Sequence, residues 1–161
     1  MRKPVARGWM VVLAVILAIG LLLASTRSVV APQAAIPAET AARQALAAGR
    51  DTGLGGYLAP PERILGMQMR FIDALRFVFG ANVGEDRSRP DGYPVWLVVL
   101  EGEFIEHVPA APPDIPAKDV THSQMALLID AQTGEAFESM LISPQHPLDT
   151  RSLPVLPRPG E

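Results

Sequence analysis

Three histidines are the side chains of this sequence best suited to bind a metal ion or to respond to pH. They are His107, His122 and His146, and no two have the four-residue spacing that places a pair on one face of a helix for zinc. His107 and His122 flank a proline-rich stretch, so their rings would meet if the strands that carry them paired. We favour solvated loop histidines, and the alternative is a weak metal- or pH-responsive site at His107 and His122.

Three glutamates beside His107 could support general acid–base chemistry. Glu101 and Glu103 lie on the same face of an expected strand, with Glu106 close behind them. They stand where an apolar run ends, and charged side chains at a sheet edge discourage pairing with other chains, so we interpret them as a solvated face. The sequence has neither a nucleophile elbow nor a G-x-x-x-x-G-K phosphate loop. We therefore expect a protein that is not an enzyme and has no cofactor.

Two aromatic side chains could contact another protein. Tyr93 precedes the most apolar strand of the chain and Trp96 lies near its start, and aromatic residues are enriched at protein interfaces. Alternatively, Trp96 packs in the core, because it shares a strand face with Val98 and Leu100. The six methionines are read as core residues that fill gaps.

The charge distribution argues against nucleic acid as a partner. The 161 residues carry a net charge of −3, and residues 1–27 contain four basic residues and no acid, so residues 28–161 carry −3 − 4 = −7. A domain this acidic repels a phosphate backbone. There is no cysteine, which excludes disulfide bonds and a lipid-modified N-terminal cysteine.

The N-terminal segment predicts attachment to a membrane or export across one. Residues 9–26 carry no charge and form about 27 Å of helix, close to the thickness of a bilayer core. Basic residues in segment 1–8 favour a cytoplasmic N-terminus, which places the rest outside the cell membrane. A cleaved signal peptide, with a site at 22–24 or 29–31, is the alternative and would give a secreted protein. Residues 27–38, with two prolines, predict a stalk.

Residues 39–142 predict one small α+β domain. Apolar spacing and glycine positions favour helices at 39–48 and 70–79, ended by Gly49 and Gly80. Residues 50–61 and the proline-rich stretch 108–117 are expected to be loops. An antiparallel sheet of about four strands follows from the remaining apolar runs, at residues 62–69, 95–105, 124–130 and 136–142. The proline-rich tail, 143–161, is expected to be an extended, poorly ordered arm.

The last two strands are expected to form a hairpin. Asp130 can accept hydrogen bonds from backbone N–H groups two or three residues on, Thr133 can close the turn, and Gly134 can adopt a positive φ. These three residues are predicted to have a structural role.

The order of elements and two motifs resemble the PepSY-like group of small extracytoplasmic bacterial domains. The motifs are the aromatic-containing strand P-V-W-L-V-V-L-E-G-E-F at 94–104 and the hairpin L-I-D-A-Q-T-G-E at 128–135. The resemblance implies helices packed on an antiparallel sheet and, in some relatives, a role in restraining peptidases or in sensing at the cell envelope. It implies no catalytic residues. We therefore expect a single-pass, membrane-anchored module that binds a protein or peptide of the envelope, with the histidine-based sensor as the alternative.

Overall fold

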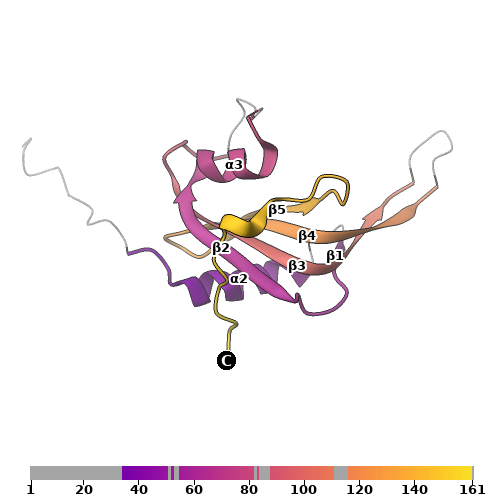
Figure 1. Cartoon of the computed structure of the whole chain (residues 1–161), viewed down its shortest axis with the longest axis horizontal. Helices are drawn as coiled ribbons and strands as arrows, with labels where there is room; N and C mark the ends of the chain where they lie inside the picture. The colour runs from indigo at the N-terminus through magenta and orange to yellow at the C-terminus, as the bar shows by residue number, and fades with distance from the viewer. Residues whose placement is uncertain are drawn as a thin grey trace, which may run out of the picture. The chain divides into compact units, whose positions relative to one another are not determined.

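The computed structural model describes residues 34–50, 52, 55–81, 83, 88–110 and 116–160. In this part, two α-helices pack with a five-stranded antiparallel sheet, so the α+β class is confirmed (Figure 1). The expected basic segment 1–8, the membrane segment 9–26 and residues 27–33 of the stalk lie outside the described residues. No described helix is both long enough and apolar enough to cross a bilayer.

The sheet is built around two long, paired strands. β3 (Pro94–Val108) and β4 (Lys118–Asp130) form an antiparallel pair joined by the proline-rich connection, and β5 (Ala136–Ile142) pairs with β4. On its other edge, β3 pairs with β2 (Arg63–Arg70) along one half and with β1 (Gly55–Tyr57) along the other. Both central strands extend beyond the ranges expected from the sequence, because cross-strand bonding continues past a bulge between Glu101 and Phe104.

Each face of the sheet is covered by one helix. Alternate residues of β3 point to opposite faces, so Val98 and Leu100 lie on the side of α2 (Ala38–Arg50), whereas Val95, Leu97 and Val99 lie on the side of α3 (Phe71–Phe79). Figure 1 shows the two helices on opposite sides of the sheet. Residues 97–100 of β3 are fully buried, which explains their uninterrupted apolar run.

Two details of the helices and loops differ from the sequence expectations. α2 does not end before Gly49 but continues to Arg50, and Gly49 is buried where a Cβ atom would lie 2.9 Å from Leu100 Cδ1. This glycine therefore serves close packing of the helix on β3 and not helix termination. The expected loop 50–61 contains β1. Gly55 and Gly56 in this strand lie so close to neighbouring backbone that a side chain would not fit at either position. The helix expected at 70–79 is confirmed, and Gly80 ends it with a φ of 73°.

The C-terminal segment is packed against the domain, so the prediction of a poorly ordered arm is wrong there. We define residues 148–156, which include the short 3₁₀ helix η1 (Thr150–Ser152), as the C-terminal strap. Leu153 and Leu156 are buried, and the strap pairs with the outer edge of β2 through the Gly66 N–H to the Pro154 carbonyl and the Leu156 N–H to the Ile64 carbonyl. The prolines exclude a long regular strand but allow this short pairing.

Candidate functional site

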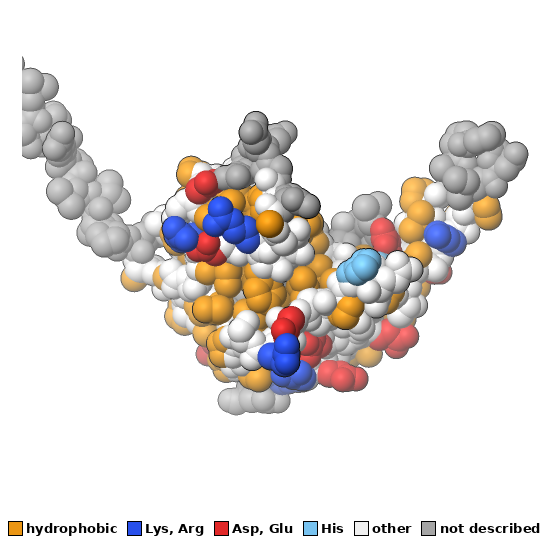
Figure 2. Space-filling model, turned by 45° about the horizontal axis from the view of Figure 1, so that its top comes forward, with side chains coloured by type: hydrophobic (Ala, Val, Ile, Leu, Met, Phe, Trp, Pro, Cys, Tyr) orange, Lys and Arg blue, Asp and Glu red, His pale blue; other side chains and the backbone are white. Residues whose placement is uncertain are grey.

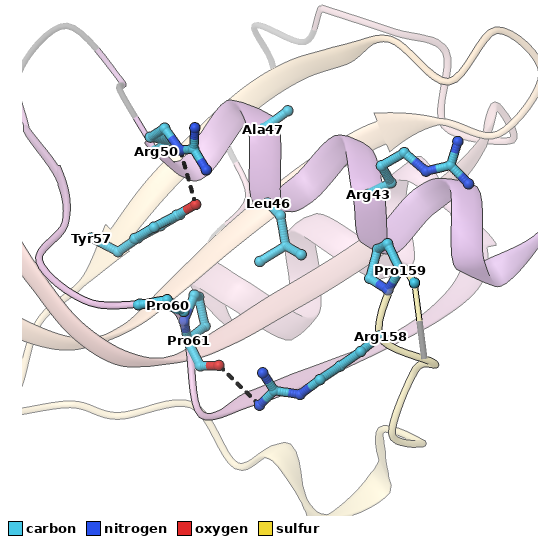
Figure 3. A pocket seen from close by; sticks show the side chains of 10 residues that line it. Arg43, Leu46, Ala47, Arg50, Tyr57, Pro60, Pro61, Arg158 and Pro159 are labelled. Atoms are coloured by element: carbon cyan, nitrogen blue, oxygen red, sulfur yellow. Dashed lines mark hydrogen bonds between the residues drawn. The ribbon is translucent and has the colours of Figure 1, made fainter.

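A groove lies between α2, the β1–β2 connection and the residues that follow the strap. Its cavity volume is about 610 Å³, and it is partly open to solvent. Figure 3 shows the side chains that line it. Three arginines, a tyrosine and three prolines dominate its lining, and we call it the arginine groove. The lining residues are Arg43, Leu46, Ala47, Arg50, Tyr57, Pro60, Pro61, Arg158, Pro159 and Gly160.

One face of α2 forms one wall of the groove. Arg43, Leu46, Ala47 and Arg50 follow the spacing of neighbouring positions on a helix surface, so they line up along the same side. The opposite side of α2 consists of small residues buried against the sheet, namely Ala41, Ala42, Ala45 and Gly49. Because these side chains are small, the helix lies close to the sheet, and a Cβ atom on Gly49 would lie 2.9 Å from Leu100 Cδ1.

β1 holds Tyr57 against the end of α2. A Cβ atom on Gly56 would lie 2.1 Å from the Arg50 carbonyl oxygen, so only glycine allows β1 to approach the helix this closely. Arg50 Nε donates a hydrogen bond to the Tyr57 hydroxyl at 3.3 Å. This bond raises the pKa of the Arg50 guanidinium above its ordinary value, and a guanidinium is in any case charged across the physiological pH range.

Arg158 closes the other side of the groove. Its Nη2 donates to the Pro61 carbonyl oxygen at 3.1 Å and also contacts the Glu62 carbonyl oxygen. Figure 3 shows Arg158 reaching toward Pro61 from the C-terminal segment. The groove is thus assembled from residues 43–61 and from residues 158–160, two regions that are far apart in the sequence.

The groove is positively charged although the domain is acidic. No aspartate or glutamate of the described chain lines it, whereas residues 28–161 carry a net charge of −7. Arg43 forms an ion pair with Glu39 at 3.1 Å, but both side chains are more than half exposed, so solvent screens this pair strongly. Arg50 and Arg158 contact neutral oxygen atoms.

The structure brings His107 and His122 to different carboxylates. His107 is exposed on β3 and lies 2.7 Å from Asp119, whereas His122 is buried on β4 and lies 2.8 Å from Glu106. The expectation of solvated loop histidines is therefore wrong for His122, because the strand that carries it continues past the bulge. His146 is exposed in the connection that follows β5. Within the described residues, no three histidine, cysteine or acidic side chains form a group that could hold a metal ion.

Both ring nitrogens of His122 face oxygen acceptors. Nδ1 lies 3.0 Å from the Ile142 carbonyl oxygen, and Nε2 lies 2.8 Å from a carboxylate oxygen of Glu106. A neutral imidazole carries one N–H, so it cannot donate to both. With a neutral ring, only one of the two contacts is a hydrogen bond donated by His122, and the tautomer decides which one.

The three glutamates of β3 do not form an acid–base pair. Glu101 accepts hydrogen bonds from Arg63, Gln124 and Thr150, and the last two of these residues connect it to the strap. Gln124 in turn contacts the backbone of Leu148. Glu103 is exposed, and Glu106 contacts His122. The solvated-face interpretation holds for Glu103, whereas Glu101 fastens the strap to the sheet.

Tyr93 and Trp96 lie on opposite faces of the sheet, so they do not form one surface. Tyr93 donates its hydroxyl hydrogen to Asp130 at 2.6 Å on the side of α3, and the Arg89 guanidinium lies over its ring. Trp96 packs on the side of α2 and donates from Nε1 to the Ile36 carbonyl oxygen at 3.2 Å. Figure 2 looks toward the side that carries α3 and shows hydrophobic side chains gathered there, with charged side chains around them.

The hairpin residues lie together in the turn between β4 and β5. Asp130 Oδ1 accepts from the backbone N–H groups of Gln132 and Thr133, at 2.8 and 3.0 Å. The Thr133 hydroxyl accepts from the Glu135 N–H, and Gly134 has a φ of 79°. Asp130 thus joins the turn to Tyr93, which precedes β3.

Sequence reasoning did not identify the arginine groove. One signal was present, since Arg43, Leu46, Ala47 and Arg50 share a helix face that alternates charge with small or apolar groups. The contributions of Tyr57 and Arg158 carry no local signal, because tertiary contacts alone bring them to this helix. Comparison of the chain with protein-family models, with curated proteins and with solved structures found no match.

Proposed function

We propose that this chain is a PepSY-like binding module of the cell envelope, without catalytic activity, and that it binds a protein or peptide in the arginine groove. The observation that carries the proposal is a groove with three guanidinium groups and no lining carboxylate among the described residues, on a domain with a net charge of −7. A positive concave surface on an acidic protein directs partners of opposite charge to one place.

The proposal includes a location outside the cell membrane. Residues 9–26 would anchor the module, with residues 1–8 in the cytoplasm, and cleavage of this segment would instead release the module as a secreted protein. A peptidase of the envelope, restrained by the module, is one partner that fits the resemblance.

Contacts of the acidic side chains support binding rather than catalysis. Glu101 and Asp130 are each held by several hydrogen bonds that connect structural elements. Such bonds fix the fold and leave these carboxylates fewer free lone pairs for chemistry.

Site-specific photo-crosslinking in the native host tests the proposal. A photoreactive amino acid at Ala47, in the wall of the groove, should give a crosslinked adduct with an envelope protein when the full chain is expressed. The same amino acid at Ser152, exposed on the strap, is the matched control and should give no such adduct. Equal adducts at both positions, or none at Ala47, would contradict binding in the groove.

The contacts of His122 favour a second candidate function, a response to pH. A neutral ring can donate either to the Glu106 carboxylate on β3 or to the Ile142 carbonyl oxygen on β5, whereas a protonated ring can donate to both, so the contacts of β4 with its neighbouring strands depend on the protonation of this ring. This candidate uses Glu106 as the partner of His122, in place of His107.

Nuclear magnetic resonance of the imidazole ring and the carboxyl group tests this second candidate. If His122 responds to pH, the signals of its ring and of the Glu106 carboxyl should change together over the pH range in which the domain stays folded, and Glu106→Gln should alter this change because the amide can donate to Nε2. His107, paired with Asp119 at the surface, is the internal control. A neutral ring beside an ionised carboxylate throughout the folded pH range would eliminate the candidate.

A further inference from the structure

We propose that the ligand of the arginine groove is an acidic peptide segment whose aspartate or glutamate carboxylates bind between Arg50 and Arg158. This inference rests on the proposed function and adds the chemistry of the ligand.

Both arginines have guanidinium N–H groups to offer. Arg50 uses Nε for the Tyr57 hydroxyl, and Arg158 uses Nη2 for the carbonyl oxygens of Pro61 and Glu62. Within the described residues, the other guanidinium nitrogens of these two side chains have no hydrogen-bond acceptor. The planar fork of a guanidinium matches a carboxylate, which can accept two parallel hydrogen bonds from it.

The existing contacts hold the two guanidinium groups without neutralising them. Arg50 lies in the last turn of α2, where the helix dipole is negative, and its charge offsets that partial charge. A bound anion must therefore contact the guanidinium groups themselves and not the helix end. The hydroxyl and carbonyl partners orient the side chains in advance, which lowers the entropy cost of binding.

The size and lining of the groove favour a peptide over a single small anion. A volume of about 610 Å³ lies in the range of pockets that hold drug-sized ligands, much larger than a phosphate or a carboxylate group. Leu46, Tyr57 and Pro60 supply apolar surface next to the charged groups. The methylene groups of a glutamate side chain and an extended backbone can pack on this surface while the carboxylates contact the arginines.

Fluorescence anisotropy with the full chain in mild detergent tests the inference. The probe is a fluorescein-labelled hexaglutamate peptide, and the matched control peptide is hexaglutamine. We expect binding of hexaglutamate only, weakened as salt is raised from low ionic strength because solvent ions screen the exposed guanidinium groups. Equal binding of the two peptides, or no binding of hexaglutamate at low salt, would overturn the inference.

Substitutions of the groove arginines test where hexaglutamate binds. Arg50→Gln and Arg158→Gln should each weaken hexaglutamate binding about threefold to fivefold, and the double variant about tenfold or more. Arg50→Lys keeps the charge but loses the fork and should fall between wild type and Arg50→Gln. Arg151→Gln is the control, because Arg151 is exposed outside the groove, and it should leave binding unchanged. An unchanged affinity in the double variant, with an unchanged circular dichroism spectrum, would refute the site.

Competition with inorganic phosphate distinguishes a carboxylate-bearing ligand from a phosphate-bearing one. At matched ionic strength, phosphate should displace hexaglutamate no better than chloride does. Specific displacement by phosphate would show that the groove selects phosphate and would overturn the inference. A crosslinked partner at Ala47 that lacks acidic segments would also overturn it while leaving the proposed function intact.

Discussion

Asp130 connects three parts of the domain through one side chain. Its carboxylate accepts from the hydroxyl of Tyr93, which precedes β3, and from the Gln132 and Thr133 N–H groups in the hairpin turn. Burial alone would raise the pKa of Asp130, but the bonds from Tyr93, Thr133 and Gln132 outweigh it and hold the pKa below 3.8. The folded protein therefore favours the ionised form of Asp130 more strongly than the unfolded chain does.

This pKa shift predicts how stability depends on pH. The contribution of Asp130 is fully present above its ordinary pKa of 3.8 and is lost as pH falls through the lowered folded pKa. We expect the free energy of unfolding of wild type to fall more steeply below pH 4 than that of Asp130→Asn, measured by urea denaturation at a series of pH values. Parallel curves for the two proteins would show that Asp130 does not contribute in this way.

The interactions of a residue could be predicted from the sequence where its hydrogen-bond partners are its near neighbours along the chain. Asp130, Thr133 and Gly134 lie within five residues of one another, so their turn follows from sequence. His122 gave no such indication, because its partners Glu106 and Ile142 reach it only through strand pairing. The sequence left two interpretations of Trp96 open, a contact surface shared with Tyr93 or a position in the core, and the structure supports the second because Trp96 and Tyr93 pack on opposite faces of the sheet.

At the scale of elements, the contact between β1 and α2 determines the shape of the arginine groove. Gly56→Ala would place a methyl group 2.1 Å from the Arg50 carbonyl oxygen. We expect this change to cost about 2 kcal/mol or more of unfolding free energy and to weaken hexaglutamate binding, as measured by chemical denaturation and anisotropy. Gly92→Ala is the control, because a methyl group there meets no atom within 4 Å. Equal stability of the two variants would contradict the close approach.

The C-terminal strap gives a second prediction about elements. Leu156 is buried and Val155, its neighbour, is 66% exposed, so they form a matched pair on one short segment. Leu156→Ala should lower the free energy of unfolding by about 2–4 kcal/mol. Val155→Ala should change it by less than about 0.5 kcal/mol. Thermal or urea denaturation followed by circular dichroism measures both, and similar losses would argue against packing of the strap.

Neither the packing of the strap nor β1 was predicted from the sequence, and the reason is the same for both. Prolines in the strap and glycines in β1 are poor strand formers, and each element is formed by contact with a neighbour that is distant in the sequence. α3 was predictable because its apolar spacing and Gly80 act locally.

For the whole molecule, the central strand pair should be the most stable part. Leu97, Leu100, Met125 and Leu128 are fully buried, and β3 and β4 each have strands on both sides. We expect their amides to exchange hydrogen most slowly, at rates set by global unfolding, and those of β5, at the sheet edge, to exchange faster. Hydrogen exchange measured by mass spectrometry checks this, and equally slow exchange throughout β5 would contradict it.

The overall class was predictable, whereas the groove was not. Strand and helix periodicity along residues 39–142 indicated an α+β domain, with the central strand at residues 95–105. The groove is formed by residues 43–61 together with Arg158, so it forms only when the C-terminal segment packs against the rest of the domain. The composition shows that the domain is acidic, but it does not show where the arginine side chains come together in the fold.

The pairing of the strap with β2 also affects how molecules behave toward one another. When the strap detaches, the backbone of β2 near Leu65 loses its neighbour and becomes an open template for a strand from a second molecule. The same strap from another copy is the best-fitting strand for that edge, so exchange of straps between copies becomes a route to swapped dimers and larger aggregates. Substitutions that loosen the strap should therefore promote self-association at high protein concentration before they unfold the domain.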